Sequence, residues 1–528
     1  MRLVYLLVSL GMVFCCTDVA IAKNTHKYAK KTSTHKKVIV AKKKSPVKKP
    51  LANNRTKSVR TIAKRVAPPA PITAVRGASQ LWGQLNYIIN PVAVESGADI
   101  AVFVKSMKNG EKLYSRNINR PLTPASTLKV LTAEAALIFL KPEYRFSTQL
   151  LTDAQTVKNG VLQGNLYVVL GGDPSLTYND LLDLVLNLRT QEISGITGNV
   201  YIDHTAYDQS FYGPDWVWKD RGYCYAAPIS ASIINHNCLP FRVSPSKVGQ
   251  VATVETYPNF FYPRIHNYVI TKPNRSACSV HLSSDLGNGL EIEGCMPKGK
   301  DAWGVSYVVT DVQEYNRALF RDVLNNMGIK VNGNVTFGAA PKNPSMIAHH
   351  VSEPLSELVI EMLKKSDNVI AGALFKKLGQ LYTRKQGSWE SGSLAVSQIL
   401  TRNAGMNLSG LKILDGSGLS PSNLTTPSQM MQVLDFAFHH APTNGAFITA
   451  LQIAGVDGTL KHRMGNIARR VRAKTGTISG VVSLAGYVMT ADNEILAFVI
   501  MVNGNKGMTW KYKEMEDRIA TALAKYRR

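Results

Sequence analysis

The sequence contains no C-x-x-C pair among its six cysteines, and none of its 11 histidines lies in the H-E-x-x-H spacing of zinc proteases. Structural zinc sites and thioredoxin-like redox sites both require closely spaced ligands or thiols. The pairs His349-His350 and His439-His440 are therefore interpreted as surface or packing residues. These absences argue against a zinc centre and against dithiol redox chemistry.

Acidic residues are absent between positions 23 and 72, a stretch that holds 16 lysines and arginines. These account for 16 of the 26 net positive charges, so the rest of the chain is only mildly basic. Because like-charge segments with few apolar residues to bury stay disordered, we predict a disordered basic arm over residues 23–72. Two interpretations stay open: a tether to an anionic surface such as wall polymers, lipid headgroups or nucleic acid, and a solvated spacer. Nucleic-acid binding by the globular part is disfavoured, since most of the charge excess lies in the arm.

The N-terminal apolar run, Leu3 to Phe14, is shorter than the roughly 20 residues that a membrane-spanning helix needs. Arg2 precedes the run, and Ala20-Ile21-Ala22 has the small-x-small pattern of a cleavage site. We predict a cleaved signal peptide over residues 1–22 and a periplasmic, possibly envelope-associated protein. An uncleaved anchor and a lipoprotein anchored at Cys15-Cys16 stay open as alternatives, although the bulky Phe14 disfavours the lipoprotein.

Export makes the four remaining cysteines informative, because an oxidising compartment permits disulfide bonds. Four cysteines allow three pairings. We favour the two local bridges, Cys224 with Cys238 and Cys278 with Cys295.

The stretch Pro124-Ala125-Ser126 predicts the start of a helix, since proline suits a first turn and the residues that follow are rich in alanine and leucine. Residues three apart on a helix share a face, which brings the Lys129 amine within reach of the Ser126 hydroxyl. A neutral lysine can accept the proton of a serine nucleophile, and a helix N-terminus adds partial positive charge where an oxyanion would form. The tetrapeptide alone also fits a capping serine and an exposed lysine.

Strand patterns near both ends of the globular part suggest one antiparallel sheet flanked by helices. Residues 100–104 and 112–114 surround the hairpin turn Lys108-Asn109-Gly110, and residues 471–503 contain three further strand patterns. An amphipathic helix over about residues 510–525 follows them.

Between these ends, the residues from 143 to 342 are rich in strand patterns and hold all four remaining cysteines. We predict an α+β multidomain protein in which one domain, built from residues 73–142 and 343–528, carries a large β-rich insertion over residues 143–342. The aromatic cluster of the insertion is interpreted as core rather than as a ligand site. It comprises Tyr207, Phe211, Tyr212, Trp216 and Trp218.

Three short motifs stand in order along the chain: Ser126-x-x-Lys129, Ser366-Asp367-Asn368 and Lys474-Thr475-Gly476. Together they form the signature of penicillin-binding proteins and class A β-lactamases. The first opens a predicted helix, the second lies between two predicted helices, and the third lies on a predicted strand. Their order and context point to acyl transfer on Ser126.

Each motif has a physical role in that chemistry. Ser126 is the predicted nucleophile, and Lys129 is its base, kept neutral by burial and by the nearby Lys474 cation. Ser366 can relay a proton toward the leaving amine, while the Asn368 amide orients Lys129 and the substrate backbone.

The third motif and the residue after it are predicted to bind the substrate. Lys474, Thr475 and Thr477 offer positive charge and hydroxyls to a terminal carboxylate. The backbone N–H groups of Ser126 and Thr477 are the candidates for an oxyanion hole. Gly476 would let substrate lie close against the strand.

The chain resembles the D-alanyl-D-alanine carboxypeptidases/endopeptidases of the penicillin-binding protein 4 type, the class C low-molecular-mass penicillin-binding proteins. The resemblance runs from about residue 76 to the C-terminus and includes the family's large insertion, since Ser126 and Ser366 are 240 residues apart. It implies a β-lactamase/transpeptidase-like domain interrupted by that insertion. The further matching segments are Gly171–Leu176, Asp415–Ser420, Ala454–Leu460 and Ala473–Thr477.

The resemblance also implies an activity: cleavage of peptidoglycan stem peptides through an acyl-enzyme on Ser126, with release of D-alanine or of a cross-linked neighbouring strand. It implies inhibition by β-lactams, and neither a metal nor a cofactor. Cysteines spaced like Cys224 and Cys238 occur in the family, which supports their pairing. The lysine-rich arm departs from the family pattern, so the resemblance does not identify its partner.

Two rival functions stay open from the sequence. A serine β-lactamase or esterase of the same superfamily would use the same motifs, although the long insertion argues against it. A non-catalytic wall-binding protein would leave the three motifs without a purpose. The balance between carboxypeptidase and endopeptidase activity and the oligomeric state are not determined by the sequence.

Overall fold

The computed structural model describes residues 74–257, 264–284, 287–504, 507 and 509–528. The predicted signal peptide (1–22) and basic arm (23–72) lie outside these residues. Among the helices of the described ranges, none is both long enough and apolar enough to cross a bilayer.

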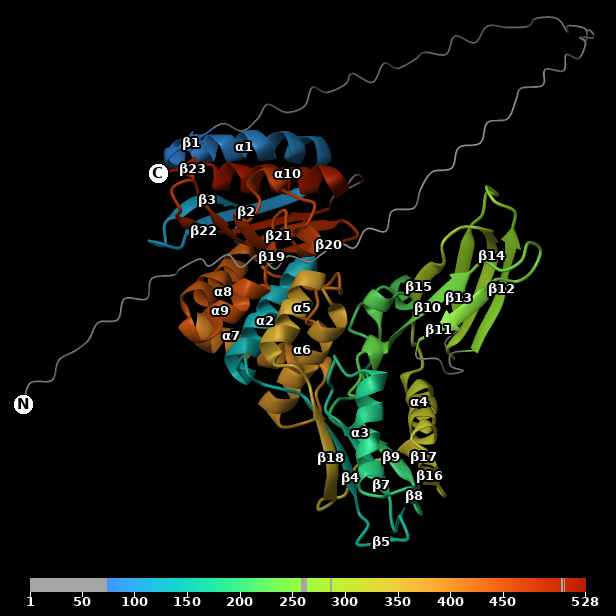
Figure 1. The fold of residues 1–528 in the computed structure, drawn as a ribbon. Coiled ribbons are helices and arrows are strands. Elements are labelled where there is room, and N and C mark those ends of the chain that lie inside the picture. Colours follow the sequence, from blue (N-terminus) through green and yellow to red (C-terminus); the bar gives the residue numbers. More distant parts are fainter. Residues whose placement is uncertain (1–73, 258–263, 285–286, 505–506, 508) are drawn as a thin grey trace, which may run out of the picture. The chain divides into compact units, whose positions relative to one another are not determined.

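A six-stranded antiparallel sheet joins the two ends of the described chain (Figure 1). The register places Asp99 opposite Asn503, so the N-terminal hairpin and the C-terminal strands form one sheet, as the sequence predicts. The strands, in sheet order, are β19 (Gln452–Ile453), β20 (Val471–Ile478), β21 (Val481–Met489), β22 (Ile495–Asn503), β2 (Asp99–Ser106) and β3 (Lys112–Arg116).

The side chains of the sheet alternate between two hydrophobic cores, as the period of two in a strand requires. On β2, Ile100, Val102 and Val104 belong to the core beneath α1 (Gly77–Ser96) and α10 (Thr509–Ala524). Ala101 and Phe103 belong to the opposite core. Beside α1 and α10, the short strands β1 (Val75–Arg76) and β23 (Tyr526–Arg527) pair in parallel.

The opposite face of the sheet is covered by a second group of helices, which includes the elements that carry the first two motifs (Figure 1). The short 3-10 helix η1 (Ala125–Leu128) leads into the first of them. The group comprises α2 (Lys129–Leu140), α5 (Leu355–Lys365), α6 (Asn368–Thr383), α7 (Trp389–Ala404), α8 (Pro427–His439) and α9 (Ala441–Ala450).

The chain between α2 and α5 forms sheets separate from the six-stranded one. The first part is a five-stranded sheet, a smaller four-stranded sheet and the helices α3 (Tyr178–Thr190) and α4 (Val312–Asn326), around a core of their own. The five-stranded sheet is β17 (Val335–Phe337), β9 (Val200–Asp203), β7 (Leu166–Leu170), β4 (Ser147–Thr152) and β18 (Ser345–Val351). The four-stranded sheet is β16 (Lys330–Val331), β8 (Gly195–Ile196), β6 (Val161–Leu162) and β5 (Val157–Lys158). Because β18 pairs with β4, this sheet extends beyond residue 342.

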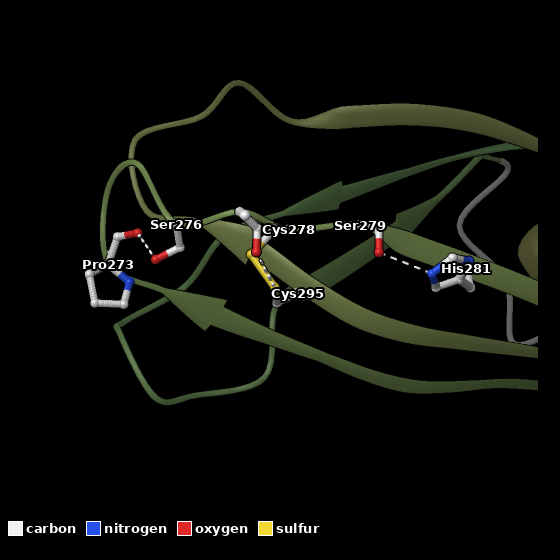
Figure 2. The surroundings of a disulfide bond; sticks show 7 residues. Pro273, Ser276, Cys278, Ser279, His281 and Cys295 are labelled. Carbon is white, nitrogen blue, oxygen red and sulfur yellow. Dashed lines mark hydrogen bonds between the residues drawn. A yellow bond between two sulfur atoms is a disulfide. The ribbon is translucent and has the colours of Figure 1, made fainter. Parts of the chain in front are cut away.

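The second part consists of two three-stranded sheets that share another small core. One sheet is β11 (Thr253–Thr256), β10 (Cys238–Ser244) and β15 (Trp303–Val308), and the other is β12 (Arg264–Lys272), β14 (Gly289–Pro297) and β13 (Val280–Ser284). The predicted disulfides are both present. Figure 2 shows Cys278–Cys295, which fixes the chain just before β13 to β14.

The interpretation of the aromatic cluster as core is right for its two deepest members and wrong for its last. Tyr207 and Trp216 are buried, whereas Trp218 is 64% exposed. The ring of Trp218 lies instead against the Arg221 guanidinium, 4.2 Å from the ring centroid. The histidines of the two pairs are exposed or half-buried, as interpreted.

Candidate active site

The turn that carries Ser126 is held between a strand and a loop from distant parts of the chain. The predicted helix start is a 3-10 turn, after which α2 begins at Lys129. Ala125, just before the serine, is buried and left-handed, with φ 49°. A Cβ at Gly418 would lie 1.9 Å from the Ala125 carbonyl oxygen, and a Cβ at Gly476 would lie 2.8 Å from that of Pro124. Both glycines are therefore required by close backbone approach.

Glycine is required at position 476 for a reason that differs from the one expected from the sequence. Its missing side chain makes room for the turn before Ser126 and for the Ser483 hydroxyl, 2.2 Å from where a Cβ would be. Strand β20 thereby runs directly beside the backbone of Ser126.

The Lys129 amine joins the first two motifs. Its Nζ lies 3.1 Å from Ser126 Oγ and donates to Asn368 Oδ1 at 2.6 Å and to the Ser417 carbonyl at 2.7 Å. Lys129 is fully buried, and burial lowers its pKa to about 7, although the carboxylates of Asp415 and Asp367 oppose this shift. A lysine with this pKa is partly neutral at neutral pH and can accept the Ser126 proton.

The Ser366-Asp367-Asn368 motif occupies the junction of two helices. Ser366 ends α5 in the left-handed conformation, and Asp367 caps α6 by accepting from the Ile370 N–H at 2.8 Å. Asn368 donates from Nδ2 to the Tyr225 carbonyl at 2.7 Å. Since its oxygen is engaged by Lys129, the amide is fixed at both ends.

The third motif reaches the second through Lys474. Its Nζ donates to Ser366 Oγ at 2.8 Å and to the Thr475 carbonyl at 2.7 Å. Burial, and secondarily the Lys129 cation, hold the pKa of Lys474 well below its usual value. The sequence predicts that the Lys474 cation shares in lowering the Lys129 pKa; in the structure, burial is the cause that lowers it.

Thr475 of the third motif and Thr477 just after it do not contact the amines of Lys129 and Lys474 through their side chains. Thr475 Oγ1 lies 2.5 Å from Thr459 Oγ1, and Thr477 is exposed. The structure thus forms two hydrogen-bonded groups, Ser126–Lys129–Asn368 and Ser366–Lys474. The second motif supplies a residue to each group, and Thr475 to Thr477 follow along strand β20.

A family model described as the D-Ala-D-Ala carboxypeptidase 3 (S13) family matches residues 84–526. The chain belongs to this family. Its fold and motifs therefore make it a serine-type D-Ala-D-Ala carboxypeptidase with the α+β fold of the penicillin-binding proteins, which confirms the resemblance.

Two relatives and one solved structure illustrate the similarity. The chain is 32% identical to the D-alanyl-D-alanine carboxypeptidase DacB of Haemophilus influenzae, over 77% of this chain and 86% of the relative. It is also 32% identical to the D-alanyl-D-alanine carboxypeptidase of Actinomadura sp. strain R39, over 85% of each. The crystal structure of penicillin binding protein 4 from Haemophilus influenzae superposes with a TM-score of 0.73 at 30% identity, covering 83% of this chain and 99% of that one. That protein is also solved in complex with a β-lactam.

In this S13 carboxypeptidase, Asp415 is a site residue that sequence reasoning left without a role. The fully buried carboxylate accepts from the backbone N–H groups of Ser417, Gly418 and Ser420 at 2.9, 2.7 and 2.8 Å. It also accepts from Trp216 Nε1 at 2.7 Å. Asp415 therefore shapes the loop whose Ser417 carbonyl holds Lys129. The segment Asp415–Ser420 matches the family, but nothing in its spacing indicates this contact.

The loop between Cys224 and Cys238 supplies a second set of contacts that the sequence does not reveal. Near one end, Tyr225 accepts from Asn368, and near the other, His236 Nδ1 lies 3.4 Å from Asp367 Oδ2. His236 is the middle of three successive left-handed residues, with φ 50°, 56° and 49° at residues 235–237. Burial alone would lower the pKa of His236, but the Asp367 carboxylate, with Glu361, outweighs burial and Lys365 and raises it.

Replacing His236 with alanine is expected to slow acylation of Ser126 severalfold, because Asp367 loses the partner that steadies the start of α6. Since the pKa of His236 is raised, its charged form stabilises the site at low pH, and this contribution is lost as pH rises through that pKa. The ratio of wild-type to variant rates, measured with fluorescent penicillin, should thus be larger at acid than at alkaline pH. His266→Ala, at an exposed position on β12, is the control. A ratio of one at every pH would show that the His236 contact is irrelevant.

Proposed function

We propose that this S13 carboxypeptidase removes the terminal D-alanine from peptidoglycan stem peptides through an acyl-enzyme on Ser126, and that it also cleaves cross-links as an endopeptidase. The observation that carries the proposal is the position of the Lys129 amine, which is buried, has a pKa of about 7 and lies 3.1 Å from the serine hydroxyl. In a folded protein such an amine serves acid–base chemistry better than charge pairing.

Acylation starts when Ser126 Oγ attacks the carbonyl carbon of the penultimate D-alanine and Lys129 accepts the hydroxyl proton. The oxyanion that forms is stabilised by the backbone N–H groups of Ser126 and Thr477. Collapse of this intermediate breaks the peptide bond, and a proton relayed through Ser366 reaches the departing amine.

The remaining residues of the three motifs orient the substrate. Lys474, with the hydroxyls of Thr475 and Thr477, binds the terminal carboxylate, whose negative charge would favour the protonated form of the buried Lys474. Asn368 holds Lys129 and faces the peptide backbone. Water then hydrolyses the ester on Ser126, and β-lactams, which mimic the substrate, acylate the same oxygen.

An extracytoplasmic, periplasmic location is part of the proposal. The N-terminal 22 residues have the pattern of a cleaved signal peptide. Two disulfide bonds fit an oxidising compartment, because the cytosol keeps thiols reduced.

Mass spectrometry of muropeptides digested with the purified enzyme tests the proposal. We expect pentapeptides to lose one D-alanine and cross-linked dimers to split into monomers. Shortened pentapeptides with intact dimers would restrict the activity to carboxypeptidase action, and rapid nitrocefin hydrolysis with unchanged muropeptides would favour a β-lactamase instead.

The pH dependence of acylation should follow the protonation of Lys129. Because the base must be neutral and its pKa is about 7, the rate of labelling by fluorescent penicillin should fall about tenfold per pH unit below pH 7 and level off at higher pH. Stopped-flow or timed labelling over a pH series measures this. A rate that stays flat from about pH 5 to pH 8 would contradict a lysine base.

A further inference from the structure

The segment Ala454–Leu460 matches the family but belongs to none of the three motifs. It follows the short strand β19, which pairs with β20 just before Lys474. The segment ends in a 3-10 turn over Gly458–Leu460. It therefore leaves the sheet beside the strand that carries the third motif.

The same segment is held against the end of α5, where Ser366 is the next residue. The Asp457 carboxylate accepts from the Ile453 N–H at 2.7 Å and pairs with the Lys364 amine. A Cβ at Gly458 would lie 2.8 Å from the Lys364 carbonyl oxygen, so glycine permits this close approach. The segment thus keeps a fixed position relative to the second motif as well.

Gln452, just before the segment, connects the two motifs through its side-chain amide. The residue is fully buried, and its Nε2 donates to the carbonyls of Leu363 and Lys364 at 2.8 and 3.1 Å. Carbonyls in the last turn of a helix lack a partner within the helix, which explains the two contacts. Because the amino group is engaged there, Oε1 is directed away from α5. It accepts from Thr459 Oγ1 at 2.7 Å, and Thr475 Oγ1 lies 3.5 Å from it.

The hydroxyls of Thr459 and Thr475 form a pair that solvent can reach. Their Oγ1 atoms lie 2.5 Å apart, and either one can donate to the other. Thr459 is exposed and Thr475 is half-buried. A hydroxyl has one proton to donate and two lone pairs that accept, so Thr475 can donate to a carboxylate while it accepts from Thr459. Hydrogen bonds in such a chain strengthen one another.

We propose that Thr459 is a positioning residue for recognition of the terminal carboxylate: it supports the Thr475 hydroxyl, and Gln452 holds it in place. The proposal rests on the proposed function, in which Thr475 binds that carboxylate. The Lys129 amine has its contacts with Ser126, Asn368 and Ser417, so removal of the Thr459 hydroxyl leaves the base in place. Thr459 should consequently affect how well a carboxylate is bound and not the chemistry at the serine.

The test compares acylation by benzylpenicillin with acylation by its methyl ester, which has the same β-lactam ring but no free carboxylate. Thr459→Val removes the hydroxyl and keeps the shape of the side chain. We expect its second-order rate constant of acylation to fall about fivefold with benzylpenicillin and to stay within about twofold with the methyl ester. Thr459→Ser, which keeps the hydroxyl, should react with both compounds like the wild type.

The matched control is Thr253→Val, the same change at an exposed position on β11, which should leave both rates unaltered. A second measurement uses a peptide that ends in D-alanyl-D-alanine. With this substrate, Thr459→Val should raise KM about fivefold and leave kcat unchanged, since it removes an interaction with a carboxylate that is bound equally in the ground state and the transition state.

Three results would overturn the proposal. They are equal losses with benzylpenicillin and the methyl ester, no loss with benzylpenicillin, and a fall in kcat at unchanged KM. A wild-type enzyme that releases no D-alanine from the peptide would instead refute the proposed function, and the two penicillins would still decide the role of Thr459.

Discussion

Replacing Lys129 with arginine is expected to lower the rate of Ser126 acylation by about a thousandfold, the usual contribution of a general base. Arginine keeps the positive charge and much of the length of lysine, but it cannot lose its proton in a protein. The three contacts of the Lys129 amine could be partly retained, whereas proton transfer from Ser126 could not. The rate is measured by the appearance of the β-lactam adduct in the intact mass spectrum.

The matched control is Lys105→Arg, at a lysine that pairs with Asp435 at 3.0 Å on the sheet. It makes the same chemical change away from the site and should acylate at the wild-type rate. A Lys129→Arg enzyme that is folded and acylates within tenfold of the wild type would remove Lys129 from the role of base.

Replacing Gly418 with alanine is expected to lower the free energy of unfolding by about 3 kcal/mol and to abolish most of the acylation. The new Cβ would meet the Ala125 carbonyl oxygen at 1.9 Å, and φ at this position is +79°. Because the collision partner is backbone one residue before Ser126, relief of the overlap must move the nucleophile. Chemical denaturation and penicillin labelling measure the two effects.

Gly405→Ala separates the steric effect from the conformational one. Gly405 has φ +61° and nothing within 4 Å of its Cβ position, so alanine there brings only the cost of the left-handed conformation, about 1 kcal/mol. Its labelling should be normal. If both variants lose the same stability and both label normally, the loop of Gly418 does not shape the nucleophile turn.

Much of the fold could be predicted because its strands and turns follow from local residue patterns. Residues 100–104 and 471–503 alternate or run apolar as strands do, and the hairpin turn at Gly110 fixes the pairing of β2 with β3. The insertion could be located because it lies between the two chain segments that form the terminal sheet and is itself rich in strand patterns. The pairing of β18 with β4 could not be foreseen, since partner choice depends on contacts across 200 residues of chain.

The residues of the site likewise fall into those that the sequence predicts and those that it does not. The three motifs predict Ser126, Lys129 and Lys474 as site residues, because each motif is a short local pattern carried by one turn or one strand. The contacts of His236 and Asp415 depend on how loops from elsewhere fold over α6 and α2, which no local spacing encodes. The sequence therefore predicts the residues of the three motifs, but it does not predict the residues that position them.

The most direct test of the account is to identify the atom that a β-lactam acylates. The enzyme is reacted with benzylpenicillin, digested and mapped by tandem mass spectrometry, in the wild type and in Ser126→Ala. The account predicts one adduct, on the peptide that contains Ser126 and at that oxygen, and none in the variant. An adduct on another residue, or an unmodified Ser126 in folded wild-type enzyme, would contradict it.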